Sequence, residues 1–135
     1  MQLLLLLILA VYVTLTLGAY VVEPGTLVVT PTGITAKLKW NNKSNSLDLP
    51  DGTTPIPSLA LSIRYSTKQR LRIRITDPND ATRWEVPGIS IVDVEEAIEA
   101  SQSSSLNYAV SVNEDEFGVS VTRKGTGEIL WKSTR

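Results

Sequence analysis

Apolar and polar residues alternate along most of the chain after residue 19. The alternation is clearest in Ile34–Trp40, in Leu59–Ser66 and in Arg70–Asp77. A period of two is typical of a β-strand that has one face buried and the other in water. The polar run Ser66–Gln69 connects the last two segments, so residues 59–66 and 70–77 are predicted to form a hairpin.

Shorter alternating segments lie on both sides of this hairpin. Residues 20–30 predict one or two strands, interrupted at Pro24-Gly25. Towards the C-terminal end, turn-forming residues separate three further segments, which predict a meander: Tyr108–Val112, Phe117–Val121 and Ile129–Trp131. Only Val92–Ala100 has a helix-forming composition, and a short exposed helix is predicted there. Seven or eight short strands indicate an all-β fold, an antiparallel β-sandwich.

The first 19 residues differ from the rest because they are almost wholly apolar. Leu3–Leu17 contains two threonines as its only polar residues, and the small residues Gly18 and Ala19 follow. This pattern predicts a helical signal peptide over residues 1–19, cleaved to leave one domain over residues 20–135. No Lys or Arg precedes the apolar run. The run is also close to the roughly 20 residues that span a bilayer, so an uncleaved membrane anchor is the alternative.

One modification site is predicted. The triplet Asn42-Lys43-Ser44 matches the pattern of an N-glycosylation acceptor. It lies in the polar run Asn41–Ser46, which is typical of a surface loop. If the chain enters the secretory pathway, Asn42 is therefore a candidate for glycosylation.

The charge balance and two absent residue types exclude several classes of function. The chain has 13 Lys and Arg against 14 Asp and Glu, a net charge of −1, whereas a nucleic-acid binder carries a strongly basic surface. Cysteine and histidine are both absent. This excludes disulfides, zinc–thiolate sites, and Ser–His–Asp or Cys–His catalysis. We predict no cofactor, no metal site and no nucleic-acid partner.

Four arginines should share the outer side of the predicted hairpin. Three interpretations are open: an anion-binding patch, a solvated strand face, or a joint with another domain. The solvated face or joint is favoured, because exposed strand faces commonly carry such charges. The four residues are Arg64, Arg70, Arg72 and Arg74.

Other polar and aromatic residues have simpler structural interpretations. Asp77–Asp80 resembles the start of a calcium loop, but the EF-hand spacing fails downstream, so a turn is predicted. Trp40, Trp84 and Trp131 could stack on a sugar, although core burial is the simpler account of Trp40. Glycoside hydrolysis requires two carboxylates across the scissile bond, and no such pair is identified. No catalytic residue is predicted.

Three segments carry a resemblance to a known family. Tyr65–Asn79 followed by Arg83–Pro87 is very similar to the N-terminal region of glycoside hydrolase family 31 α-glucosidases. Gly33–Leu38 resembles a strand of the same region, and Phe117–Leu130 resembles a later strand pair. Together these motifs cover nearly the whole chain after the leader, in the family's order. The loop at residues 51–56 departs from the family pattern.

The resemblance implies a galactose-mutarotase-like β-sandwich, whole or in part, that packs on a catalytic barrel. About 115 residues cannot contain that barrel, which needs about 250. The expected function is therefore the non-catalytic N-terminal domain of a secretory-pathway α-glucosidase, extracellular, vacuolar or lysosomal. The expected partner is the barrel, and carbohydrate is a second candidate. No contact with a membrane is expected once the leader is cleaved.

Two alternatives remain open from the sequence. The chain could be a stand-alone secreted module that binds carbohydrate or protein, or a membrane-anchored structural domain if the leader is kept. An unpaired edge strand exposes backbone groups that favour association. We therefore expect the isolated mature chain to be marginally folded or prone to aggregation.

Overall fold

The structure is a computed structural model that describes residues 20–41, 54–80, 82 and 104–133. These ranges contain eight strands and no α-helix, and every strand pairing among them is antiparallel. The predicted all-β antiparallel fold is confirmed. None of the described residues forms a helix that could cross a membrane. The predicted signal segment 1–19 and the predicted helix Val92–Ala100 lie outside the described residues.

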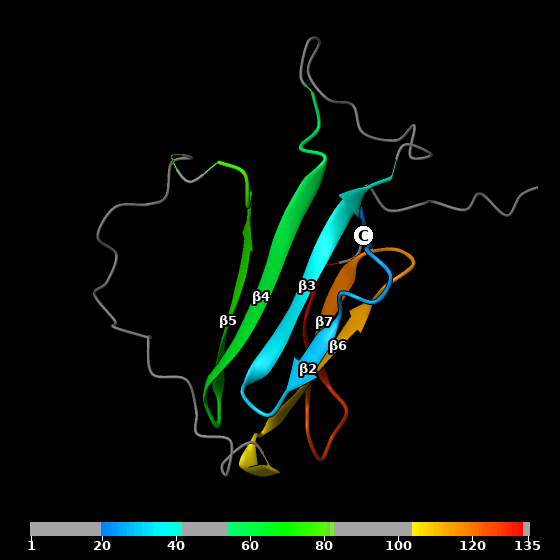
Figure 1. The fold of residues 1–135 in the computed structure, drawn as a ribbon. Helices are drawn as coiled ribbons and strands as arrows, with labels where there is room; N and C mark the ends of the chain where they lie inside the picture. Colours follow the sequence, from blue (N-terminus) through cyan, green and yellow to red (C-terminus); the bar gives the residue numbers. More distant parts are fainter. Residues whose placement is uncertain (1–19, 42–53, 81, 83–103, 134–135) are drawn as a thin grey trace, which may run out of the picture.

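The larger sheet has the order β1-β3-β4-β5, with β2 paired to β3 beside β1 (Figure 1). β1 and β2 together follow one side of β3, and the turn between them contains Gly25 at a φ of 77°. A positive φ of this size favours glycine, which explains the interruption predicted at Pro24-Gly25. The strands are β1 (Tyr20–Val22), β2 (Val28–Thr30), β3 (Gly33–Trp40), β4 (Ser58–Thr67) and β5 (Arg70–Thr76).

The smaller sheet is the predicted meander, with the order β6-β7-β8. Its strands are β6 (Tyr108–Asn113), β7 (Gly118–Arg123) and β8 (Ile129–Lys132). Phe117 precedes β7 and belongs to the turn, one residue before the strand begins. In Figure 1, β6 and β7 lie behind β2 and β3, so the two sheets face each other.

One hydrophobic core fills the space between the sheets. The inward positions of β3 and β4 alternate with exposed ones, as period-two patterning requires. Fully burying a Leu, Ile or Val side chain contributes about 1.5–3 kcal/mol. The core therefore holds the sandwich together. Its least exposed large members are Leu38, Leu61, Ile63 and Val119.

The two long sides of the sandwich are not equivalent. On one side, the amide of Val22 donates to the carbonyl of Glu114 at 2.9 Å, and the amide of Phe117 donates to the carbonyl of Tyr20 at 2.9 Å. These bonds join β1 to the turn between β6 and β7. On the opposite side lie β5 and β8, each of which ends its sheet in the described residues. A groove lies between them.

Candidate functional site

The groove between β5 and β8 is a candidate binding feature of the described surface. Its volume is about 420 Å³, within the size range of small-molecule pockets. Apolar side chains dominate the lining, and Gln69 and Arg70 add polar groups. None of the lining residues is acidic. The lining consists of Gln69, Arg70, Leu71, Ile73, Tyr108, Val121, Leu130 and Trp131.

A bulge in β8 places two large side chains beside the groove. Trp131 pairs with Val121 and Ile129 pairs with the next residue of β7, Thr122, so Leu130 is the additional residue. Leu130 and Trp131 both line the groove, although adjacent residues of a regular strand face opposite sides. Leu130 is 44% exposed and Trp131 is 47% exposed. The groove thus presents apolar surface to solvent.

Tyr108 connects the groove wall to the larger sheet. Its hydroxyl lies 3.2 Å from the carbonyl oxygen of Thr67 and 3.0 Å from that of Arg70, and donates towards both. Its ring meets Tyr65 edge to face, with the ring centroids 6.0 Å apart. Burial, and secondarily the charge of Tyr65, raises the pKa of Tyr108 to about 12. The phenol is therefore neutral at physiological pH, and its role is to hold the β4–β5 turn against β6.

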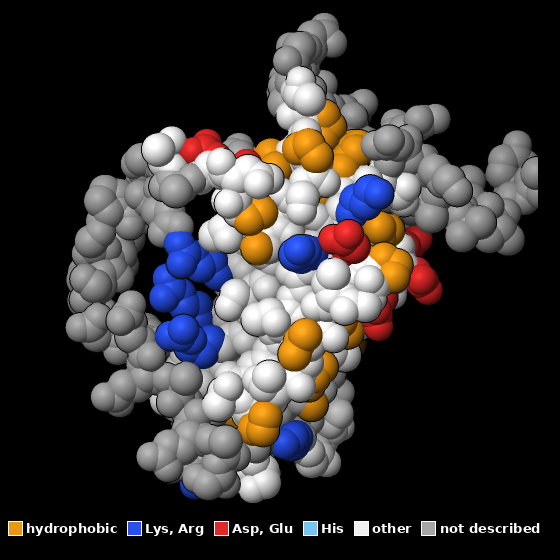
Figure 2. Space-filling model, in the orientation of Figure 1, with side chains coloured by type: hydrophobic (Ala, Val, Ile, Leu, Met, Phe, Trp, Pro, Cys, Tyr) orange, Lys and Arg blue, Asp and Glu red, His pale blue; other side chains and the backbone are white. Residues whose placement is uncertain are grey.

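The four arginines predicted to share one side do so. Arg64 lies directly opposite Arg72, and Arg70, Arg72 and Arg74 occupy alternate exposed positions of β5. Figure 2 shows Lys and Arg side chains gathered along this part of the sheet. Like charges directly opposite each other in a sheet are unfavourable. This face is suited to bind negative charge.

The loop that follows β5 is a turn, as predicted. The amide of Asn79 donates to Asp77 Oδ1 at 2.9 Å, and the amide of Thr82 donates to Asp80 Oδ1 at 3.0 Å. These bonds use the carboxylates to stabilise local backbone turns. Over the described ranges, no group of three metal-ligating side chains occurs.

Of the tryptophans, Trp40 and Trp131 lie within the described residues, and they lie in different parts of the structure. Trp40 is partly exposed and meets Tyr20 edge to face, with ring centroids 5.3 Å apart. Trp40 does not belong to the buried core, so the prediction of core burial for this residue is not confirmed. Trp131 lies on the groove. Trp84 and the glycosylation candidate Asn42 lie outside the described residues.

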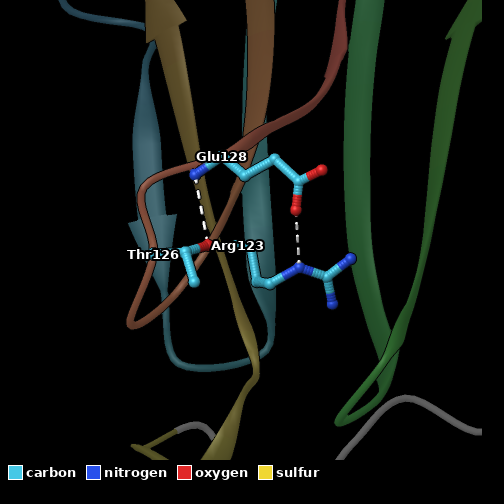
Figure 3. Close-up of polar contacts among 3 residues, drawn as sticks. All are labelled: Arg123, Thr126 and Glu128. Carbon is cyan, nitrogen blue, oxygen red and sulfur yellow. Dashed lines mark hydrogen bonds and ion pairs between the residues drawn. The ribbon is translucent and has the colours of Figure 1, made fainter.

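One described carboxylate, that of Glu128, lies in a turn. Figure 3 shows Glu128, which accepts from Arg123 Nε through Oε2 at 3.0 Å, while its amide donates to Thr126 Oγ1 at 3.4 Å. The side chains of this ion pair are 51% and 61% exposed, and such pairs contribute only about 0–1 kcal/mol. Glu128 therefore supports the β7–β8 turn. The acidic turn at residues 114–116 joins β6 to β7.

Comparison with known proteins identifies related sequences. No family model matches the chain. It is 33% identical over 103 residues to intestinal sucrase-isomaltase of Oryctolagus cuniculus. It is 33% identical over 104 residues to that of Rattus norvegicus, and 31% identical over 104 residues to that of Homo sapiens. The chain is homologous to a segment of sucrase-isomaltase.

This segment is a small part of its relatives. The alignments include 75–76% of the chain but only 5% of each relative. Sucrase-isomaltase is a glycoside hydrolase family 31 enzyme, so the relationship to that family indicated by the motifs is confirmed. The sequence motifs indicated this relationship. The groove became apparent only in the structure, because the alternation of apolar and polar residues does not indicate the bulge in β8.

Proposed function

We propose that the chain is the non-catalytic N-terminal domain of a secretory-pathway α-glucosidase. The homology to one segment of sucrase-isomaltase carries this proposal. The chain spans about 5% of the length of the relatives it matches. Catalysis in this proposal belongs to the parent enzyme, and this domain contributes scaffold. Its fold and apolar surface suit that role.

The groove supplies the contact with the rest of the enzyme. Leu130 and Trp131 expose apolar surface beside the partly buried Leu71 and Ile73 of β5. Covering such surface is favourable by about 25 cal/mol for each Å² removed from water. In the proposed enzyme, the barrel or a neighbouring segment covers this groove. An apolar groove with Trp131 at its edge also suits the alternative of a stand-alone carbohydrate- or protein-binding module.

A chimera tests the scaffold function. The segment of rabbit sucrase-isomaltase that aligns with this chain is replaced by the corresponding residues of the chain. We expect a folded enzyme that keeps its sucrase and isomaltase activities. Leu130→Lys in the chimera should reduce the yield of folded enzyme, because it places a charge in the covered groove.

Val29→Lys is the matched control. Val29 is 68% exposed on β2, away from the groove, so this change should leave the yield unaltered. Failure of the unsubstituted chimera to fold would contradict the scaffold function. Equal yields of the two lysine variants would contradict docking through the groove. Sequencing the transcript beyond the codon for Arg135 tests for a continuing reading frame that encodes a barrel.

A further inference from the structure

The outer face of the larger sheet carries basic residues along β3, β4 and β5. The three strands β3, β4 and β5 contain no Asp or Glu, although the whole chain has a net charge of −1. Their basic residues all occupy exposed positions, which alternate with the buried positions of the core. They are Lys37, Lys39, Arg64, Arg70, Arg72 and Arg74. Positive charge is therefore segregated onto one face.

The positive charges are most closely spaced on β4 and β5, where the four arginines lie. Arg64 and Arg72 are direct cross-strand partners, and Arg74 lies opposite Ser62. Alternate residues of a strand are about 6.6–6.8 Å apart, so the arginines of β5 form a regularly spaced row. Arg64 and Arg74 also take part in other interactions. The summed charge of the face, rather than any one guanidinium, is therefore what attracts an anion.

The lysines extend this charge across the sheet. Lys37 and Lys39 lie on β3, where the amide of Glu23 donates to the carbonyl of Lys37 at 2.8 Å. That contact brings an acidic residue close to the lysine end of the face. The arginine end on β4 and β5 is consequently the stronger anion site.

The chemistry of the face distinguishes among anionic partners. Ala60, Ser62 and Thr76 lie between the basic residues, and the face has no aromatic side chain on β4 or β5. A stable protein interface has an apolar core with aromatic residues, and single-stranded nucleic acid requires aromatic rings for stacking. A linear chain that carries oxyanions requires neither, because guanidinium groups bind sulfate or carboxylate through paired hydrogen bonds.

We propose that the outer face of β4 and β5 binds a linear polysaccharide that carries sulfate or carboxylate groups. An exposed sheet face admits an extended chain along its surface, and the basic residues of β4 and β5 supply repeated contacts. This inference is independent of the α-glucosidase function. It depends on the proposed secretory localisation, because the chain would encounter such a polysaccharide in that compartment.

The test measures binding of the full chain to heparin, which carries sulfate, and to polygalacturonate, which carries carboxylate. We expect retention at low salt and release as salt is raised, because ionic contacts are screened. The double variant R70A/R72A should bind about tenfold more weakly or worse, since each removed contact is a hydrogen bond to a charged group. Its salt dependence should also be shallower.

The matched control is K124A/K132A, which removes the same charge from the exposed β7–β8 region. This control should bind as the unsubstituted chain does. R72K keeps the charge but loses the paired hydrogen bonds of a guanidinium, so its affinity should lie between those of the unsubstituted chain and R70A/R72A. Circular dichroism verifies that the variants are folded. The proposal fails if the full chain binds neither polysaccharide, or if the control loses as much affinity as R70A/R72A. Tighter binding to polyglutamate or to polyuridylate would also overturn it.

Discussion

The two long sides of the sandwich differ in how the two sheets contact each other. Backbone hydrogen bonds from Val22 and Phe117 join the sheets on one side, where Val22 is buried. Between β5 and β8, side chains such as Trp131 border an open groove. Apolar residues thus stabilise the fold where they are buried in the core and form a candidate binding surface where they border the groove.

The largest effect is expected for the core between the two sheets. Leu61 on β4 is 2% exposed, so Leu61→Ala should lower the free energy of unfolding by about 2–5 kcal/mol through lost burial and a residual cavity. Urea unfolding followed by tryptophan fluorescence measures this loss. A loss no larger than that of a surface substitution would show that the core is not well packed around Leu61.

An intermediate effect is expected where Tyr108 links the sheets. Tyr108→Phe removes the hydroxyl shared between the carbonyls of Thr67 and Arg70, at a cost of about 1 kcal/mol at neutral pH. The pKa of Tyr108 is raised to about 12, above the unfolded value of about 10. Its contribution is therefore complete below pH 10 and is lost as pH rises towards 12.

The pH dependence of urea unfolding measures this contribution. The unsubstituted chain should lose stability between pH 10 and about 12, and Tyr108→Phe should flatten that decline. Some decline should remain because burial also raises the pKa of Tyr65. Identical pH profiles for the two proteins would mean that Tyr108 ionises as freely in the fold as in the unfolded chain.

The smallest effect is expected on the open side. Leu130→Ala is the same chemical change as Leu61→Ala, but Leu130 is 44% exposed at the groove. We expect a loss of about 1 kcal/mol or less, with lower self-association in light scattering because an apolar patch is reduced. A cost close to that of Leu61→Ala would indicate that the groove is covered in the isolated chain.

The regular strands were predictable from the sequence because alternation alone determines their buried face. Arg70, Arg72 and Arg74 alternate with Leu71 and Ile73, so their common outer face followed directly from the period of two. The relationship to family 31 came from local motifs, which need no knowledge of how the sheets pack. These features are encoded by neighbouring residues.

The groove was not predictable, because it depends on an irregularity in the pairing of β8 with β7. The bulge at Leu130 changes which side the β8 residues face, and no turn residue or glycine inside Ile129–Lys132 marks it. The partial exposure of Trp40 also depends on Tyr20, a partner from a strand distant in sequence. The sequence gives residue types at such positions, whereas tertiary packing determines their exposure.

The bonds that join the sheets have a consequence for synthesis on the ribosome. The amide of Val22 has its native acceptor, the carbonyl of Glu114, only after most of the chain has been synthesised. About 40 residues separate β5 from β7, which corresponds to about 2–8 s at about 5–20 residues/s. Throughout that interval the core residues of the larger sheet lack their β7 partners Val119 and Val121. Chaperones that shield apolar surface during translation would therefore be most valuable to this domain before β7 emerges.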